Sequence, residues 1–275
     1  MSRCFAPQRT LSNFVAFCHT SGLNRALPLP PGARLHMKLQ VLHQDTTMIA
    51  FDKPSGLAVH ESDYTGPLED TAVAHAREEF GEVFTVHRLD AATSGVLLFA
   101  RSKVAAAKLC GQFEAQSVRK KYLAVVRGWA PQEGVIDQAL PDTNGVVKPA
   151  RTTFRCLGRC ALPVPMGRYP QARYSLIEAT PETGRMHQIR RHFKFLSHPL
   201  VGDVRYGKGD HNRLFRDKFG LNRLLLHAWR ISFDHPTSGE RVELTAPIDS
   251  ELTVVFTELG WTLPSDLPPQ VPPVV

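Results

Sequence analysis

The chain has 275 residues, is 43% hydrophobic, and carries 33 Lys and Arg against 26 Asp and Glu, a formal net charge of +7. This length can bury one large core or two modest ones. No apolar run approaches the roughly 18 residues of a membrane-spanning helix, so no such helix is expected. The positive charge favours a polyanionic partner, because Lys and Arg release counterions from phosphates.

The five cysteines are scattered and form no CxxC pair. Such usage suits a reducing compartment, so we expect a cytoplasmic protein without a disulfide framework. Cys156 and Cys160 lack the further ligands that a structural zinc needs. We therefore expect no metal site.

The first 36 residues contain no Asp or Glu and end in a Pro-rich loop. We expect this segment not to pack. It is either an organellar presequence or, the interpretation we prefer, an over-long gene model. The domain is then predicted to span residues 37–262, followed by a disordered Pro-rich tail over 263–275.

Two short apolar stretches, 39–42 and 48–51, flank a polar turn and predict a β-hairpin. Lys53-Pro54-Ser55-Gly56 predicts a tight turn after it. Lys53 either lines a cleft or is a solvated turn lysine. The segment 68–80, followed by Gly81, predicts a helix with a glycine stop.

An apolar run from Val96 to Phe99 predicts a buried strand, and the polar turn before it holds one carboxylate, Asp90. His87 and Arg88 flank Asp90 as cations, and small residues follow it, which leaves room for a substrate. A carboxylate on a loop that a strand holds in place suits catalysis. The alternative is that Asp90 only caps the turn and pairs with Arg88.

Ser102 is predicted to cap a helix that buries a stripe every four residues, and residues 119–128 join a cationic cluster to a second buried strand. Tyr122, within that strand, is by itself an aromatic of the core. The pattern from 131 to 170 is weak, and 152–156 is consistent with an edge strand.

Residues 174–179 predict another strand, followed by a turn that leads into a helix. On that helix His187, Arg190, Arg191 and Lys194 are spaced to share one face, which is ordinarily a solvated basic face. The basic stretch 205–223 is predicted to face the polyanionic partner. A strand beginning at 224 should pair with 241–245. Hairpins with interspersed helices, without strict β-α alternation, favour an α+β fold.

Several motifs together resemble one enzyme family. His87-Arg88-Leu89-Asp90, followed by Thr93-Ser94-Gly95 and an apolar strand, resembles the signature of the RluA-type pseudouridine synthases. The likeness covers about residues 37–262. It implies a mixed, mostly antiparallel sheet with helices on its faces and a central catalytic cleft. It also implies conversion of a uridine in structured RNA to pseudouridine without a cofactor.

The resemblance implies a role for individual residues. Asp90 would be the nucleophile, Arg190 its charge partner and Tyr122 the aromatic under the target base. Whether Asp90 attacks C1′ of the ribose or C6 of the base stays open. The substrate-binding residues that the resemblance implies are His87, Arg88, Leu226, Arg185, His187, Gln188 and Lys53.

The expected partner is tRNA, because the insertion 163–170 resembles one subgroup, the C type of tRNA pseudouridine synthase. The expected target is uridine 65 in the T-stem, and no obligate protein partner is evident. Two alternatives remain: a synthase of the same family acting on ribosomal RNA or another tRNA position, and a catalytically silent RNA-binding domain. A glycoside hydrolase is disfavoured because it needs a second carboxylate.

Overall fold

The computed structural model describes residues 38–61 and 70–262. The chain divides after His36 into two units, and all described residues belong to the second. The predictions for 1–36 and 263–275 therefore lie outside the described residues.

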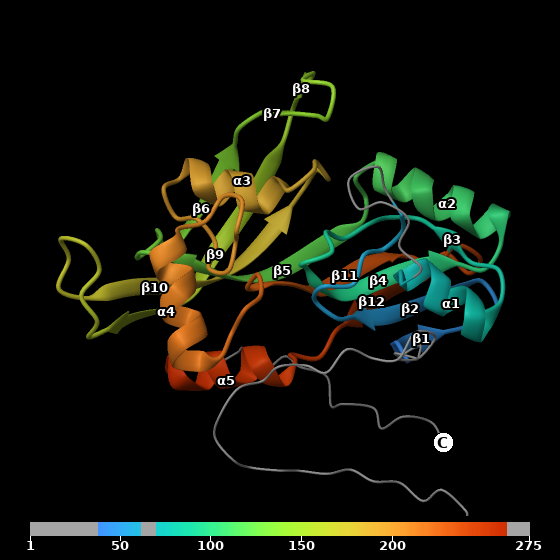
Figure 1. Ribbon diagram of the computed structural model, residues 1–275. Helices are drawn as coiled ribbons and strands as arrows, with labels where there is room; N and C mark the ends of the chain where they lie inside the picture. The colour runs from blue at the N-terminus through green and yellow to red at the C-terminus, as the bar shows by residue number, and fades with distance from the viewer. Residues whose placement is uncertain (1–37, 62–69, 263–275) are drawn as a thin grey trace, which may run out of the picture. The chain divides into compact units, whose positions relative to one another are not determined.

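The second unit is built on a mixed, mostly antiparallel sheet with the order β1-β2-β4-β11-β5-β10-β9-β6 (Figure 1). Strands β3 and β12 pair with β4 and β11, and β7 and β8 form a separate hairpin. The strands are β1 (Gln40–Gln44), β2 (Met48–Lys53), β3 (Phe84–Thr85), β4 (Ser94–Ala100), β5 (Arg119–Arg127), β6 (Glu133–Asp137), β7 (Leu140–Pro141), β8 (Val147–Lys148), β9 (Arg151–Leu162), β10 (Ala172–Pro181), β11 (Leu226–Asp234) and β12 (Arg241–Thr245).

The helices in the described ranges are α1 (Ala72–Phe80), α2 (Lys103–Glu114), α3 (Gln188–Phe195), α4 (Gly209–Phe219) and α5 (Ser250–Glu258). Their ends follow from local chemistry. The Thr71 and Ser102 hydroxyls accept the N–H of Ala74 and Ala105 at the starts of α1 and α2. Gly81 ends α1 at φ 78°, a conformation that costs glycine little.

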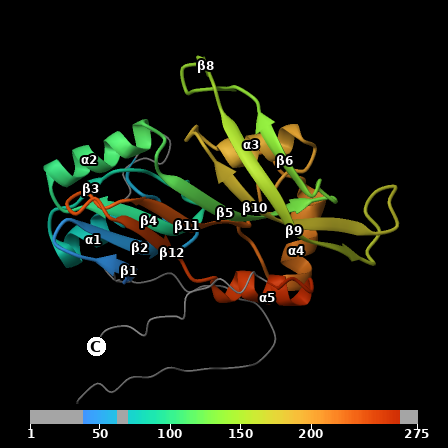
Figure 2. The same ribbon diagram turned by 180° about the vertical axis from the view of Figure 1, so that it is seen from behind.

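Helices cover both faces of the sheet, as the alternation along β5 requires. Leu123 and Val125 pack in one cluster with residues of α4 and α5, whereas Ala124 and Val126 pack in another with residues of α3. Figures 1 and 2 show α3 and α5 on opposite sides of the sheet. The predicted α+β class is thereby confirmed.

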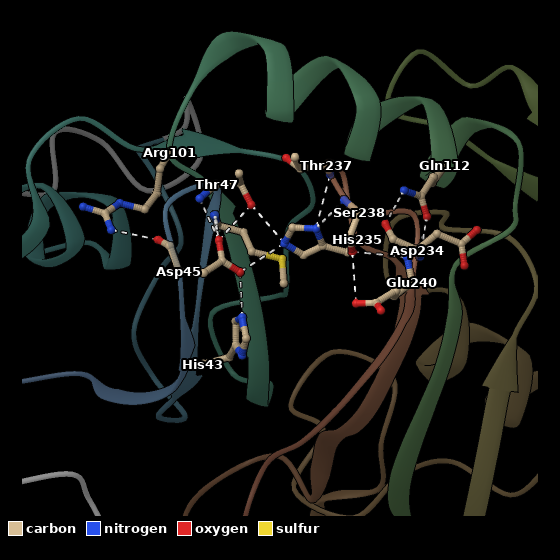
Figure 3. A network of polar contacts seen from close by, with 11 residues as sticks. His43, Asp45, Thr47, Arg101, Gln112, Asp234, His235, Thr237, Ser238 and Glu240 are labelled. Atoms are coloured by element: carbon tan, nitrogen blue, oxygen red, sulfur yellow. Dashed lines mark hydrogen bonds and ion pairs between the residues drawn. The ribbon is translucent and has the colours of Figure 1, made fainter.

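The first hairpin is tied to the turn after β11 by one carboxylate. Asp45 Oδ2 lies 2.8 Å from His43 Nε2 and 3.2 Å from His235 Nε2, between the two rings (Figure 3). Burial acts to raise the pKa of Asp45, but the bonds from His43 and Thr47 outweigh it and hold that pKa well below its usual range. The β1–β2 hairpin is thus joined to the turn between β11 and β12 through one carboxylate.

The two halves of the sheet meet where β11 lies between β4 and β5. The pair β4–β11 is parallel, and the pair β11–β5 is antiparallel. Gly95 in β4 has φ 110°, and a Cβ there would lie 2.2 Å from the carbonyl oxygen of Ala228. Only glycine permits this close approach. The loop that carries Asp90 leads directly into this junction.

The predicted hairpin, the Gly81 stop, the Ser102 cap and the pairing of β11 with β12 are confirmed. The start of the helix predicted over 68–80 falls partly outside the described residues, and the described part begins at Ala72. The edge strand predicted at 152–156 is wrong. It is part of β9, which lies between β6 and β10, so β6 forms the edge instead.

Candidate active site

The turn that follows β2 is hydrogen-bonded to the loop that carries Asp90. Lys53 Nζ donates to the carbonyl oxygens of Pro54, Leu57 and Ala91 at 2.7 to 3.0 Å. Ser55 Oγ donates to the carbonyl of Ala92 at 2.8 Å. These bonds fix the backbone directly after Asp90.

Asp90 forms an ion pair with a residue 100 positions away in the sequence. Arg190 Nη1 on α3 donates to Asp90 Oδ2 at 3.0 Å. The Asp90 side chain is 25% exposed and that of Arg190 is 9% exposed. The carboxylate therefore reaches solvent while the guanidinium that orients it does not.

A second carboxylate holds the other edge of Arg190. Arg190 Nε and Nη2 donate to the two oxygens of Asp203 at 2.7 and 3.0 Å, a bidentate pair that fixes the plane of the guanidinium. The Asp203 side chain is 0% exposed. It also accepts the backbone N–H groups of Arg205 and Tyr206.

The charges of this group reinforce one another. Burial acts to raise the pKa of Asp203, but the bonds from Arg190 and from the Tyr206 N–H outweigh it and lower that pKa. Burial acts to lower the pKa of Arg190, but Asp203 and then Asp90 outweigh it and raise that pKa. Asp203 and Arg190 are thus both ionised, and their ion pair holds the guanidinium against Asp90.

His187 lies beside Asp90, and Tyr206 lies beside His187. His187 Nε2 lies 3.7 Å from Asp90 Oδ2, and its Nδ1 lies 3.1 Å from the Tyr206 hydroxyl. Burial lowers the pKa of His187 despite the nearby Asp90 charge, so the ring is neutral at neutral pH. His187 precedes α3 with φ 54° and is not on the helix face that the spacing predicted.

Tyr122 and Leu226 belong to one apolar group beside the loop. Leu226 is a buried member of the cluster against which Tyr122 and Ala92 pack. Burial, and then the charge of Asp90, raise the pKa of Tyr122, so its hydroxyl stays protonated. The Tyr122 ring thus lies within the electrostatic influence of Asp90.

Helix α3 is fixed to β9 by a fully buried hydroxyl. Thr152 Oγ1 lies 2.9 Å from His192 Nδ1 and accepts Gln188 Nε2 at 3.0 Å. His192 Nε2 lies 3.0 Å from the carbonyl oxygen of Gln138, which fits a neutral ring with its proton on Nε2. These contacts fix α3 against β9, and with it the position of Arg190.

Two of the predicted substrate-binding residues are buried, and a third, His87, does not carry the predicted charge. Lys53 is 0% exposed and does not line a cleft, because all its donors serve backbone carbonyls. Gln188 is buried, and its amide is taken up by Thr183, Arg185, Arg151 and Thr152. His87 is not a cation. Its Nε2 accepts the Leu98 N–H at 2.9 Å, and burial, then the charge of Lys120, lower its pKa to about 3.

Three further arginines of the predicted RNA-binding surface differ in exposure and in partners. Arg88 is exposed and has no polar partner among the described residues, and Asp90 pairs with Arg190 instead of Arg88. Arg185 Nε donates to the carbonyl of Pro149. Arg223 does not face outward as predicted, because it donates to Asp249 and Ser94.

Sequence reasoning missed Asp203 and Tyr206 as members of the site. Both lie in a loop rich in Gly and charged residues, where neither hydrophobic period gives a signal. The only hint was that Asp203 is an acid within a basic stretch. Its partner could not be identified from spacing.

The site brings together one exposed carboxylate, a buried guanidinium, a protonated phenol and a neutral imidazole. This set suits nucleophilic attack by the carboxylate, whose direction the guanidinium fixes. No group of three or more His, Cys, Asp or Glu side chains that could hold a metal occurs in residues 38–61 and 70–262. None of the helices in these ranges is long and apolar enough to span a membrane.

Comparisons with known proteins agree on one family. A family model described as RNA pseudouridylate synthase matches residues 47–195. A tRNA pseudouridine synthase C from Pectobacterium carotovorum subsp. carotovorum is 40% identical over 259 residues, covering 89% of this chain and 69% of the relative. One of the same name from Vibrio parahaemolyticus is 38% identical over 237 residues, covering 82% and 96%.

Two solved human structures share the fold. Human RNA Pseudouridylate Synthase Domain Containing 4 is similar with a TM-score of 0.64 and 24% identity, covering 82% of this chain and 94% of that one. Human RNA Pseudouridylate Synthase Domain Containing 1 gives a TM-score of 0.60 and 24% identity, covering 85% and 98%.

Proposed function

The chain belongs to the RNA pseudouridylate synthase family, and from this premise we propose that it isomerises uridine 65 in the T-stem of tRNA, with Asp90 as the nucleophile. The class of enzyme, an RNA pseudouridine synthase, follows from the family. The tRNA substrate is supported by the names of the relatives, which are tRNA pseudouridine synthases C.

The observation that carries the proposal is the contact of 3.0 Å between Asp90 Oδ2 and Arg190 Nη1. A carboxylate nucleophile must be ionised and must point at the substrate. A guanidinium that is itself locked by Asp203 supplies the charge and the direction. Asp90 is the member of this group that solvent reaches most, so it is the one that RNA can meet.

The reaction breaks the bond between N1 of the base and C1′ of the ribose and forms a bond between C5 and C1′. The C5 proton leaves, N1 takes up a proton, and no atom is gained overall. Asp90 would hold the intermediate covalently, through C1′ or through C6, or would stabilise a glycal while the base turns. No oxidant, reductant or cofactor is required.

The target nucleotide lies within a stack and must be turned out, which costs a few kcal/mol. We infer that Tyr122 and Leu226 receive the base, since both lie in the apolar group beside Ala92. Stacking on an aromatic ring is worth roughly 1–3 kcal/mol. Contacts to the flanking phosphates would offset the rest.

The experiment is tritium release from C5-labelled uridine in tRNA transcripts. Asp90→Asn keeps the size of the side chain but removes its charge, so release should vanish while the Kd for tRNA stays within about a few-fold, because phosphate contacts dominate affinity. Asp217→Asn, an exposed acid on α4, is the matched control and should react normally. Release at the parent rate by Asp90→Asn would refute the assignment.

The position is tested separately by mapping pseudouridine in total RNA from cells with and without the gene. Loss at tRNA position 65 alone is expected. Loss from ribosomal RNA, or from another tRNA position, would select the alternative substrate within the same family. No loss anywhere would favour a catalytically silent RNA-binding domain. We also propose that the protein works in the cytoplasm, as expected for relatives from bacteria.

A further inference from the structure

A hollow of about 420 Å³ lies beside the Asp90 site, and its charged lining is entirely cationic. Arg127 contributes from the end of β5, Lys194 from α3, and Arg205 and Lys208 from the segment before α4. The rest of its lining is Ser197, Pro199, Tyr206 and Gly207. We call this hollow the cationic pocket.

Within the described residues, the four cations of the cationic pocket lack carboxylate partners. None of the four forms an ion pair with a residue in the described ranges. Several arginines elsewhere do lie at 3.4 Å or less from a carboxylate oxygen, among them Arg151, Arg155, Arg223 and Arg241. Four like charges around one space repel one another, and an anion that enters the space relieves that repulsion.

The cationic pocket is next to the Asp90 site and shares one wall with it. Tyr206 lines the pocket, and its hydroxyl lies 3.1 Å from His187 Nδ1, which belongs to the ring beside Asp90. The charged ends of Lys194 and Arg205 lie 5.6 and 5.5 Å from the centre of the Tyr206 ring. Asp90 itself is not part of the lining.

We propose that the cationic pocket binds a backbone phosphate of the RNA, one that neighbours the uridine turned out over Asp90. The inference rests on the proposed function, because it assumes that RNA reaches Asp90. A pocket of this size holds a phosphate with part of its nucleotide. A contact there carries no base information, but it fixes the register of the strand and offsets the cost of turning out the target.

The test compares Lys208→Ala and Lys194→Ala/Lys208→Ala with Lys103→Ala. Lys103 is an exposed lysine of α2, which lies at the other end of the sheet from α3 and α4 (Figure 1). At low salt the double variant should bind tRNA about tenfold more weakly, and the slope of log Kd against log salt should fall by about one. Its kcat/KM should fall by a similar factor, whereas Lys103→Ala should match the parent in all three quantities.

Single neutral methylphosphonates in the RNA then identify the phosphate. The parent enzyme should lose affinity at one or two linkages next to the target uridine, and the double variant should be insensitive at that linkage. Equal sensitivity of parent and double variant at every linkage, or an unchanged Kd in the double variant, would overturn the proposal. If inorganic phosphate raises the Tm of the parent but RNA binding ignores both lysines, the pocket holds a free anion and the proposal also fails.

These outcomes are separate from a failure of the proposed function. If the parent enzyme converts uridine 65 but the lysine variants behave normally, the pocket assignment is wrong and the function stands. If the parent releases no tritium from tRNA, the function is wrong whatever the pocket binds.

Discussion

Arg190 lies between two carboxylates of different exposure, and this difference separates their roles. Asp203 is buried and bidentate, so it fixes the guanidinium; Asp90 is partly exposed and accepts one remaining N–H. A buried charge that loses its partner is costly, whereas a partly exposed one can turn to water. Asp203 is therefore a positioning residue for Asp90.

We expect Asp203→Asn to destabilise the protein by about 3 kcal/mol, because it leaves the buried Arg190 with one carboxylate. The Arg190 guanidinium should also lose its fixed plane, so kcat should fall at least about tenfold while the KM for tRNA changes little. Urea unfolding and steady-state kinetics, measured well below the Tm, check both effects. A normal kcat in a destabilised variant would show that Asp203 acts on stability alone.

His87 gives the protein a pH dependence with a defined sign. Folded His87 resists protonation down to about pH 3, whereas the unfolded residue binds a proton below its ordinary pKa of 6.5. The unfolded state therefore takes up more protons within this window, and stability falls as the pH falls through it. The expected loss between pH 7.5 and 5.0 is on the order of 2 kcal/mol.

His87→Gln keeps an acceptor for the Leu98 N–H but cannot be protonated, so the variant should lose less stability than the parent over that range. Urea unfolding at the two pH values measures the difference. Identical losses in both proteins would show that His87 is not responsible.

At the scale of elements, the site depends on how α3 is fixed to β9. Thr152→Val removes a hydrogen-bond partner of His192 Nδ1 and of Gln188 Nε2, so it should destabilise the protein by about 2 kcal/mol. It should also lower kcat, because Arg190 would shift with α3. Thr153→Val, the neighbour on the same strand, is the matched control. Its hydroxyl makes only a bond of 3.4 Å to the Thr180 carbonyl, so little change is expected. Equal effects of the two changes would contradict the role given to Thr152.

The sequence predicted most helices and strands, but it did not predict which side of α3 is buried. Its spacing indicated a basic face, which in a lone helix is solvated. Arg190 is buried only because β9 is an interior strand with Thr152 turned inward. The alternation of β9 is hidden because the buried position 152 holds the polar Thr152, so the region gave a weak signal.

At the scale of the whole molecule, the family resemblance predicted the class of fold, but neither periodicity nor composition predicted the strand order. Short apolar runs identify strands without their neighbours. The insertion of β11 between β4 and β5 depends on the close approach at Gly95, which is visible only in three dimensions. The pairing of Arg190 with Asp203 is likewise a contact that only the three-dimensional structure shows.

Gly95→Ala should disrupt the junction of the two halves, because the new Cβ would lie 2.2 Å from the Ala228 carbonyl oxygen and the residue holds φ 110°. We expect little folded protein, judged by thermal unfolding and near-UV circular dichroism. Gly111→Ala within α2, where nothing lies within 4 Å of the added atom, should instead stabilise by about 1 kcal/mol. A Tm for Gly95→Ala equal to the parent's would contradict this account.

The place of β11 also governs how the enzyme is made. During synthesis β4 and β5 leave the ribosome long before residue 226, so β1-β2-β4 and β5-β10-β9-β6 can pair while the edges that β11 later joins stay open. Such edges attract other strands, and long-range pairing is slow. We therefore expect the nascent chain to be prone to edge-to-edge aggregation until β11 is made. Asp90 and Arg190 lie on opposite sides of that gap, so catalytic competence arises only when nearly the whole domain has been translated.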